Sequence, residues 1–365
     1  MPFNTLDYLL WRGDLTFDKS PINLVDQFIF SQLSTPDYQD IVSSGKKETS
    51  VEEASEAYFK THSDDYESIG VLQSRYVLTM FSELCRTERF RHAVLCGYGS
   101  RIRYEKEEQF AAVTIRLSDD LACVSFRGTD DTLIGWKEDC NLAVMDRVPA
   151  QRDAVEYLKR VAKKYPGRLM TTGHSKGGNL AIYAAASVPQ EIRSRIISAV
   201  SFDGPGFRDD FLSSEGYLEI KDRVITVLPQ NSIVGTLLNM AGTPVYVHSS
   251  MKGPLTHDGF NWDVLGTDFI RETGLGTISG NIKEIVAETL ERMSDSEKET
   301  FIDTLFSKMT ATGARSVTEL SKLSMLEKAR MLKAMKNDPC LSDFADRIIQ
   351  VTKETIFPDM LSQLA

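Results

Sequence analysis

The sequence predicts an α/β fold with a mainly parallel central sheet, preceded and followed by helical segments. Three observations predict it: helical apolar spacing before residue 95, alternating strand-like and helix-like runs between residues 110 and 248, and no strand-like run after residue 281. With 365 residues, 42% of them hydrophobic and 26% charged, the chain has a globular composition and can form one large domain with an appendage, or two domains.

The N-terminal segment, residues 1–95, is expected to be mostly helical. Residues 23–33 (NLVDQFIFSQL) and 68–84 (SIGVLQSRYVLTMFSEL) place apolar side chains three and four positions apart, which is typical of a helix with one buried face.

The central sheet is expected to begin with a hairpin, in which residues 110–117 and 121–126 are joined by the turn SDD. Alternating elements follow, as expected for parallel strands with helices on both faces. The further strands are predicted at 168–173, 197–203, 223–228 and 244–248, with helices at about 150–164 and 178–187.

The C-terminal segment is expected to be helical. Ser294 and Ser316 each precede a glutamate by three positions, the spacing of a helix N-terminal capping box, and Gly313 stands where a helix would stop. We therefore predict a first domain at residues 1–275 and a C-terminal helical appendage at 276–365.

Charge and motifs exclude several function classes. The net charge of −10 argues against nucleic acid or an anionic membrane surface as the main partner. No run approaches about 18 apolar residues, and the N-terminus lacks the pattern of a signal peptide, so we expect a cytoplasmic protein without a membrane span. No H-E-x-x-H motif or phosphate-binding loop is present, so we expect neither metal nor cofactor.

The most informative motif is Gly173-His174-Ser175-Lys176-Gly177, which has the spacing G-x-S-x-G. A strand-like run precedes it and the helix-forming run NLAIYAAA follows it, as in a nucleophile elbow, where a sharp turn exposes a serine hydroxyl above the sheet. We predict that Ser175 is a nucleophile; the alternative is an ordinary structural glycine turn.

A serine needs a base, and the chain has five histidines. His62 and His92 precede the sheet, and His174 is expected to pack structurally inside the elbow. In hydrolase sheets the base lies on a loop after the last strand, which favours His257 over His248. The alternative for His257 is a solvent-exposed loop residue.

The acid is expected to be Asp203, which ends the strand after the elbow's helix, at the sheet edge where catalytic groups gather. No carboxylate lies between Asp222 and Asp258, and Asp222 precedes its strand. Asp203 could instead only cap a turn. The remaining candidate acids are Asp209, Asp210 and Asp258.

Two further features complete the predicted site. The oxyanion hole is expected to use the N–H of Lys176 and that of Thr129 in the loop CVSFRGTDD, where Arg127 anchors the loop. The apolar segment 232–242, with Leu237 and Leu238, is predicted to form part of an acyl pocket or a small lid, or else an ordinary core helix.

The motifs VSFRGTDD, TTGHSKGGNLA and SFDGPGF together resemble the class 3 lipase family of α/β-hydrolases. Nearly the whole chain is also similar to a family of uncharacterised bacterial lipase-like proteins, from DYLLWRGDLTF through NSIVG and THDGFNW to the helical tail. The resemblance implies an α/β-hydrolase fold with a catalytic triad. This chain departs from the class 3 pattern at Lys176, where leucine is usual, and at Ser232, where the catalytic aspartate would be expected.

The sequence therefore predicts a serine hydrolase acting on small-molecule or lipid esters, or on thioesters, through Ser175, His257 and Asp203. Two alternatives remain: a hydrolase-fold binding or regulatory protein without turnover, whose helical tail docks a partner, and a peptidase. Oligomeric state and acyl length are not predicted.

Overall fold

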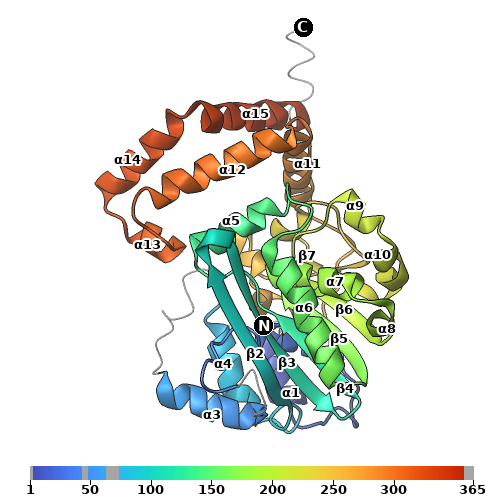
Figure 1. Ribbon diagram of the computed structural model, residues 1–365. Coiled ribbons are helices and arrows are strands. Elements are labelled where there is room, and N and C mark those ends of the chain that lie inside the picture. The colour runs from blue at the N-terminus through green and yellow to red at the C-terminus, as the bar shows by residue number, and fades with distance from the viewer. Residues whose placement is uncertain (1–2, 43–47, 63–73, 357–365) are drawn as a thin grey trace.

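A computed structural model describes residues 3–42, 48–62 and 74–356, and contains one eight-stranded sheet whose strands follow each other in chain order (Figure 1). Strands β1 to β4 pair antiparallel and β4 to β8 pair parallel. The strands are β1 (Thr49–Ser50), β2 (Val94–Arg103), β3 (Glu108–Ser118), β4 (Leu121–Phe126), β5 (Arg168–His174), β6 (Ile196–Phe202), β7 (Val224–Pro229) and β8 (Thr243–Val247). With helices on both faces, this is an α/β-hydrolase fold.

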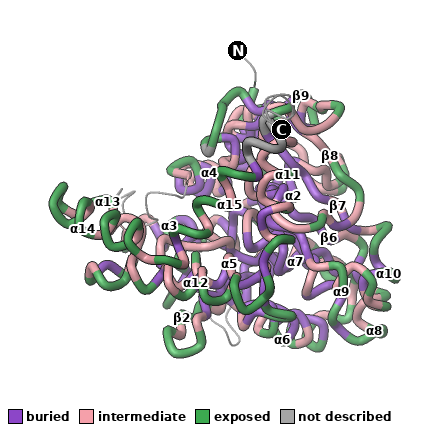
Figure 2. The backbone as a smooth tube through the Cα atoms, turned by 90° about the horizontal axis from the view of Figure 1, so that it is seen from above, coloured by how far each residue is buried: buried purple, intermediate pink, exposed green. Residues whose placement is uncertain are grey.

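Helices cover both faces of the sheet because strand side chains alternate between two cores. Val113, Ile115 and Met170 pack with the N-terminal helices α1 (Thr5–Arg12), α2 (Leu24–Gln32), α3 (Val51–Thr61) and α4 (Tyr76–Leu84). Ala112, Val124 and Leu169 pack with α6 (Pro149–Lys164) and α7 (Lys176–Ser187). Figure 2 shows the resulting buried interior, which follows the sheet and the helices that flank it.

The predicted strands and helices of the sheet region are present, but the sequence reading missed β2. This strand contains Gly97 at φ +67°, and its register with β3 shifts between Cys96 and Gly99, so it lacks a regular alternation. In the N-terminal segment, α2 confirms the helix predicted at 23–33. Of the helix predicted at 68–84, residues 68–73 lie outside the described residues, and α4 accounts for the rest.

A buried ion pair fixes α2 beneath the sheet. Arg89 and Asp26 form a salt bridge of 2.5 Å with both side chains inaccessible to solvent, and the Tyr8 hydroxyl donates to the same carboxylate at 2.8 Å. Because α2 packs on the parallel strands that carry the predicted site, this pair helps to hold the sheet's underside in place.

After the sheet come a short two-stranded ribbon, β9 (Val264–Leu265) and β10 (Asp268–Phe269), and then helices only, in the part of the tail that the structure describes. These helices are α11 (Thr277–Glu291), α12 (Asp295–Thr310), α13 (Val317–Lys322), α14 (Met325–Lys336) and α15 (Pro339–Ile356). Ser294 and Ser316 cap α12 and α13 as predicted, and Gly313 has φ +89° after α12 ends. Figure 1 shows α12 and α13 beside α5 (Leu133–Asn141) and the end of the β2–β3 hairpin.

Among the described residues, no helix combines the length and apolarity that crossing a membrane requires.

Candidate active site

The G-x-S-x-G motif forms a tight strand–turn–helix between β5 and α7. Ser175 has φ 57° and ψ −135°, a conformation that non-glycine residues rarely adopt. The flanking glycines allow it: a Cβ on Gly173 would lie 2.1 Å from Gly177, and a Cβ on Gly177 would lie 2.1 Å from the Phe126 carbonyl oxygen. The elbow geometry predicted from the motif is therefore present, and Ser175 is half-buried at the carboxyl end of β5.

The structure brings Asp203 and His257 together, although 54 positions separate them. His257 Nδ1 lies 2.7 Å from Asp203 Oδ2; the carboxylate is inaccessible, and the imidazole is 28% exposed. With Nδ1 engaged, Nε2 is the ring nitrogen left to exchange a proton. Asp203 has φ 49°, so both it and Ser175 are non-glycine residues in the left-handed region.

The second oxygen of Asp203 is held by the segment after β7. Ser232 Oγ donates to Oδ1 at 2.5 Å, and the Gly235 N–H donates to the same oxygen at 3.2 Å. A Cβ on Gly235 would lie 2.5 Å from Oδ1, so only glycine fits there. Ser232, noted in the sequence as a departure from the class 3 pattern, thus contacts the aspartate that we predicted as the acid.

The alternative residues lie elsewhere. His248 Nδ1 pairs with Asp263 at 2.6 Å, not with Asp203. Asp209 and Asp210 are exposed on α9 (Asp209–Leu212), and Asp258 accepts from the N–H of Phe260. Asp203 is the carboxylate that these contacts place on the His257 ring.

His174 contacts the base through the main chain. Its Nε2 donates to the carbonyl oxygen of His257 at 2.7 Å, and the two ring centroids are 4.6 Å apart. Phe28 of α2 and Trp262 also contact the His174 ring. Desolvation, with a contribution from the neighbouring His257, lowers the pKa of His174 to about 3. The packing role expected for His174 therefore includes a hydrogen bond that the sequence did not indicate.

The loop after β4 lies against the elbow. A Cβ on Gly128 would be 2.7 Å from the His174 carbonyl oxygen and 3.2 Å from Ser175 Cβ, so the chain passes directly beside the serine. The hydroxyl of Thr129, the next residue, donates to Asp139 Oδ2 in α5. Arg127 lies 3.7 Å from Asp130 of the same loop and donates to Ser100 of β2 at 3.4 Å; its anchoring role stays a prediction.

The side chain of Lys176 forms a buried hydrogen-bond network that was not predicted from the sequence. Its Nζ, which is inaccessible, donates to Glu138 Oε2 at 3.0 Å and to Gln109 Oε1 at 2.7 Å. Burial alone would lower the pKa of Lys176, but the carboxylates of Glu138 and Asp139 outweigh it and the pKa is raised. The only signal in the sequence was a charged lysine at the start of a helix whose later residues are mostly apolar. The network ties the start of α7 to α5.

The segment 232–242 is not a core helix. It contains one three-residue 3-10 turn, Val234–Thr236, and then extends alongside the chain after Asp203, where the Gly206 N–H donates to the Leu237 carbonyl at 2.7 Å. Leu237 and Leu238 are half-buried, and Leu238 has φ 63°. Their role as pocket residues stays a prediction.

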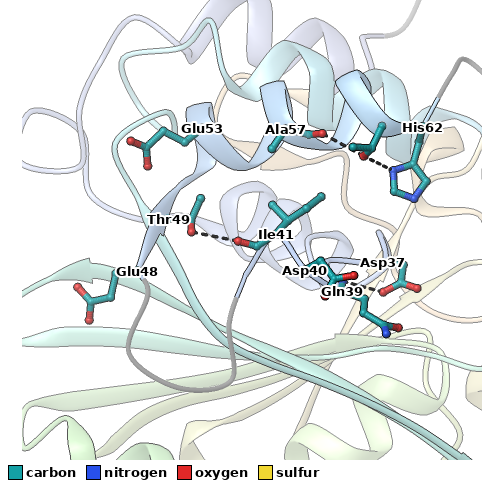
Figure 3. Close-up of a pocket in the computed structure, with 10 residues that line it drawn as sticks. Asp37, Gln39, Asp40, Ile41, Glu48, Thr49, Glu53, Ala57 and His62 are labelled. Carbon is teal, nitrogen blue, oxygen red and sulfur yellow. Dashed lines mark hydrogen bonds between the residues drawn. The ribbon is translucent and has the colours of Figure 1, made fainter.

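A separate cavity of about 750 Å³ lies between α3 and the chain that follows α2 (Figure 3). None of the predicted site residues lines this cavity. Four carboxylate residues do line it: Asp37, Asp40, Glu48 and Glu53. The candidate site is therefore defined by its chemical groups and not by this cavity.

Comparisons with known proteins give one matching family model and several solved structures of low sequence identity. A family model described as Mbeg1-like matches residues 84–307. A comparison with curated proteins finds no match. Among solved structures, the chain is similar to a native Rhizomucor miehei lipase propeptide complex (14% identity, 61% of this chain and 67% of that chain, TM-score 0.35). It is also similar to lipase II from Rhizopus niveus (13%, 56% and 84%, 0.34) and to a mutant form of MDLA from Penicillium cyclopium (13%, 70% and 89%, 0.37).

Proposed function

The chain belongs to the Mbeg1-like family, and we propose that it is a serine hydrolase that cleaves carboxylic esters. The observation that carries the proposal is the His257–Asp203 hydrogen bond of 2.7 Å, which a second hydrogen bond of 2.7 Å, from His174 to the His257 carbonyl oxygen, joins to the elbow that holds the strained Ser175. A nucleophilic serine, a histidine and a buried carboxylate that orients it are the three groups that acyl transfer needs.

In this proposal Ser175 Oγ attacks the ester carbonyl carbon while His257 Nε2 takes its proton. The same nitrogen returns the proton to the leaving alcohol as the acyl-enzyme forms, and water then reverses the sequence. Asp203 holds the imidazole and stabilises its charged form. The N–H groups of Thr129 and Lys176 receive the negative charge that develops on the carbonyl oxygen. Thioesters are a second substrate class that the same chemistry would cleave.

Ser175→Ala tests the proposal. Loss of a triad nucleophile typically reduces turnover on the order of a millionfold, so hydrolysis of a p-nitrophenyl acyl ester should disappear while the circular dichroism spectrum and the Tm stay as in the wild type. Ser213→Ala, a change of a serine in the loop after α9, is the control and should keep full activity. Retention of more than about a tenth of the wild-type rate in Ser175→Ala would be incompatible with a nucleophilic role.

A folded wild-type protein without turnover on any ester or thioester of a chain-length panel would favour the rival proposal, a hydrolase-fold binding or regulatory protein. Cleavage of peptide substrates only would favour a peptidase.

A further inference from the structure

The C-terminal helices make main-chain contact with the loop that carries Thr129. The Leu133 N–H donates to the Arg315 carbonyl at 2.9 Å, and the Val317 N–H donates to the Asp131 carbonyl at 2.9 Å, so Thr132 and Ser316 face each other in an antiparallel bridge. The Asp131 carboxylate also accepts from the Thr318 N–H at 3.2 Å. Residues 131–133 and 315–318 are nearly two hundred positions apart in the chain, yet are paired like two short strands.

Packing beside the bridge joins the same two parts of the chain. Lys137 of α5 lies 2.6 Å from Asp303 of α12. Leu133 and Val144 form a small apolar core with Ile302 and Phe306 of α12, separate from the two cores of the sheet. The bridge therefore lies at the edge of a packed interface between α5 and α12.

The bridged segment is continuous with the predicted oxyanion donor. Asp131 is two residues after Thr129, and Thr132 is the N-cap of α5, which accepts from the Gly135 N–H. Thr129 itself is tied to α5 through Asp139. The loop is thus held against the elbow at Gly128 and against the C-terminal helices at Asp131.

We propose that the C-terminal helices position the oxyanion hole, and that Asp131 is the positioning residue through which they act. This deepens the proposed function and rests on it. Donors aimed at a developing oxyanion lower the barrier only if they are already in place, and a small displacement of such a group reduces turnover strongly. The appendage is in this reading a structural part of the active site.

Val317→Pro tests the contact with little disturbance of the helix. Val317 is the first residue of α13, a position that tolerates proline, and Ser316 before it has φ −135° and ψ 162°, the backbone that precedes proline readily. The substitution removes the N–H that donates to Asp131. Met325→Pro is the matched control: it is also the first residue of a tail helix, α14, and it is 82% exposed.

Three quantities should be measured on the full-length chain: kcat and KM for a p-nitrophenyl ester, and the Ki of a trifluoromethyl ketone, whose adduct with the serine carries an oxyanion. In Val317→Pro we expect kcat to fall and Ki to rise about tenfold each, with KM within about twofold of the wild type, since a displaced donor affects the charged state and not substrate binding. Asp131→Ala, which keeps the main-chain bond, should give a smaller change in the same direction. Met325→Pro should change none of the three.

Unchanged kcat and Ki in both Val317→Pro and Asp131→Ala, with or without a lower Tm, would overturn the proposal and leave a purely structural contact. Wild-type turnover that depends on Ser175 keeps this outcome distinct from a failure of the proposed function.

Discussion

The two carboxylate oxygens of Asp203 have different partners. Oδ2 faces His257, whereas Oδ1 accepts from Ser232 and from the Gly235 N–H. This division is compatible with a proposed acid that follows β6, because the segment after β7 supplies donors that hold the carboxylate in a fixed orientation. In our proposal, Ser232 supports Asp203 as the acid and does not replace it.

Asp203→Asn should therefore lower kcat by about four orders of magnitude, because the amide stabilises neither the correct tautomer nor the imidazolium. Ser232→Ala should lower kcat only about ten- to a hundredfold, the value of one hydrogen bond to a charged group. Asp209→Asn, on the exposed helix α9, is the control. Near-normal turnover of Asp203→Asn, with loss in Asp209→Asn, would reassign the acid and leave the serine mechanism intact.

His174 links the elbow to the base and also makes stability depend on pH. Its pKa is lowered from 6.5 to about 3 by desolvation and then by His257. Between pH 6.5 and 3, His174 is therefore protonated in the unfolded chain but neutral in the native protein. Because the unfolded state binds the extra proton, the free energy of unfolding falls as the pH drops from 6.5 toward 3.

His174→Phe should flatten that part of the pH–stability curve, by up to a few kcal/mol, whatever it does to stability at neutral pH. Urea unfolding between pH 7 and 4 measures it. His92→Phe removes a histidine whose side chain is 64% exposed and serves as the control. An equal slope in His174→Phe and the wild type would contradict the assignment of this pH dependence to His174.

The segment 232–242 combines a hydrogen bond to Asp203 with two half-buried leucines that follow its 3-10 turn. If it borders the acyl group, Leu237→Ala or Leu238→Ala should shift the preferred chain length in a p-nitrophenyl ester series and change the Tm little. Leu218→Ala, at a half-exposed position of α10 (Glu215–Ile220), is the control. A large fall in Tm with an unchanged preference would instead make these leucines ordinary packing residues.

Local patterns predicted the central elements well. The alternation of β4 to β8 with α6 and α7 follows from apolar runs punctuated by glycine, and the elbow at Ser175 follows from glycines that permit close approach of strand and helix. β2 was missed because its bulge at Gly97 interrupts the alternation of side chains that marks a strand.

Contacts between residues far apart in the sequence were harder to predict. Asp203 was predicted because the span after the next strand has no carboxylate, but its hydrogen bond from Ser232 depends on how two loops meet. The Lys176–Glu138 pair and the bridge between Thr132 and Ser316 likewise join positions whose proximity only the folded chain defines. No periodicity or motif in the sequence marks either of these two contacts.

In the whole molecule, the helical tail contacts the loop after β4, and that loop contacts the elbow of Ser175. α2 packs on the parallel strands, and the loop after β4 lies beside the elbow. From the C-terminal part of the chain, α13 bonds to that loop and α12 packs on α5. The boundary predicted near residue 275 separates segments that differ in secondary structure. Under our proposal for the C-terminal helices, this boundary does not separate two independent functions.

The central claim is that Ser175 is an activated nucleophile, and its most direct test is covalent labelling. The wild-type chain is treated with a fluorophosphonate probe, and the modified residue is located by peptide mass spectrometry. The account predicts a single adduct on Ser175 that forms rapidly in the wild type and far more slowly in His257→Ala, because the base activates the hydroxyl. A folded protein that takes up no probe, or that carries it on a different serine, would contradict the account.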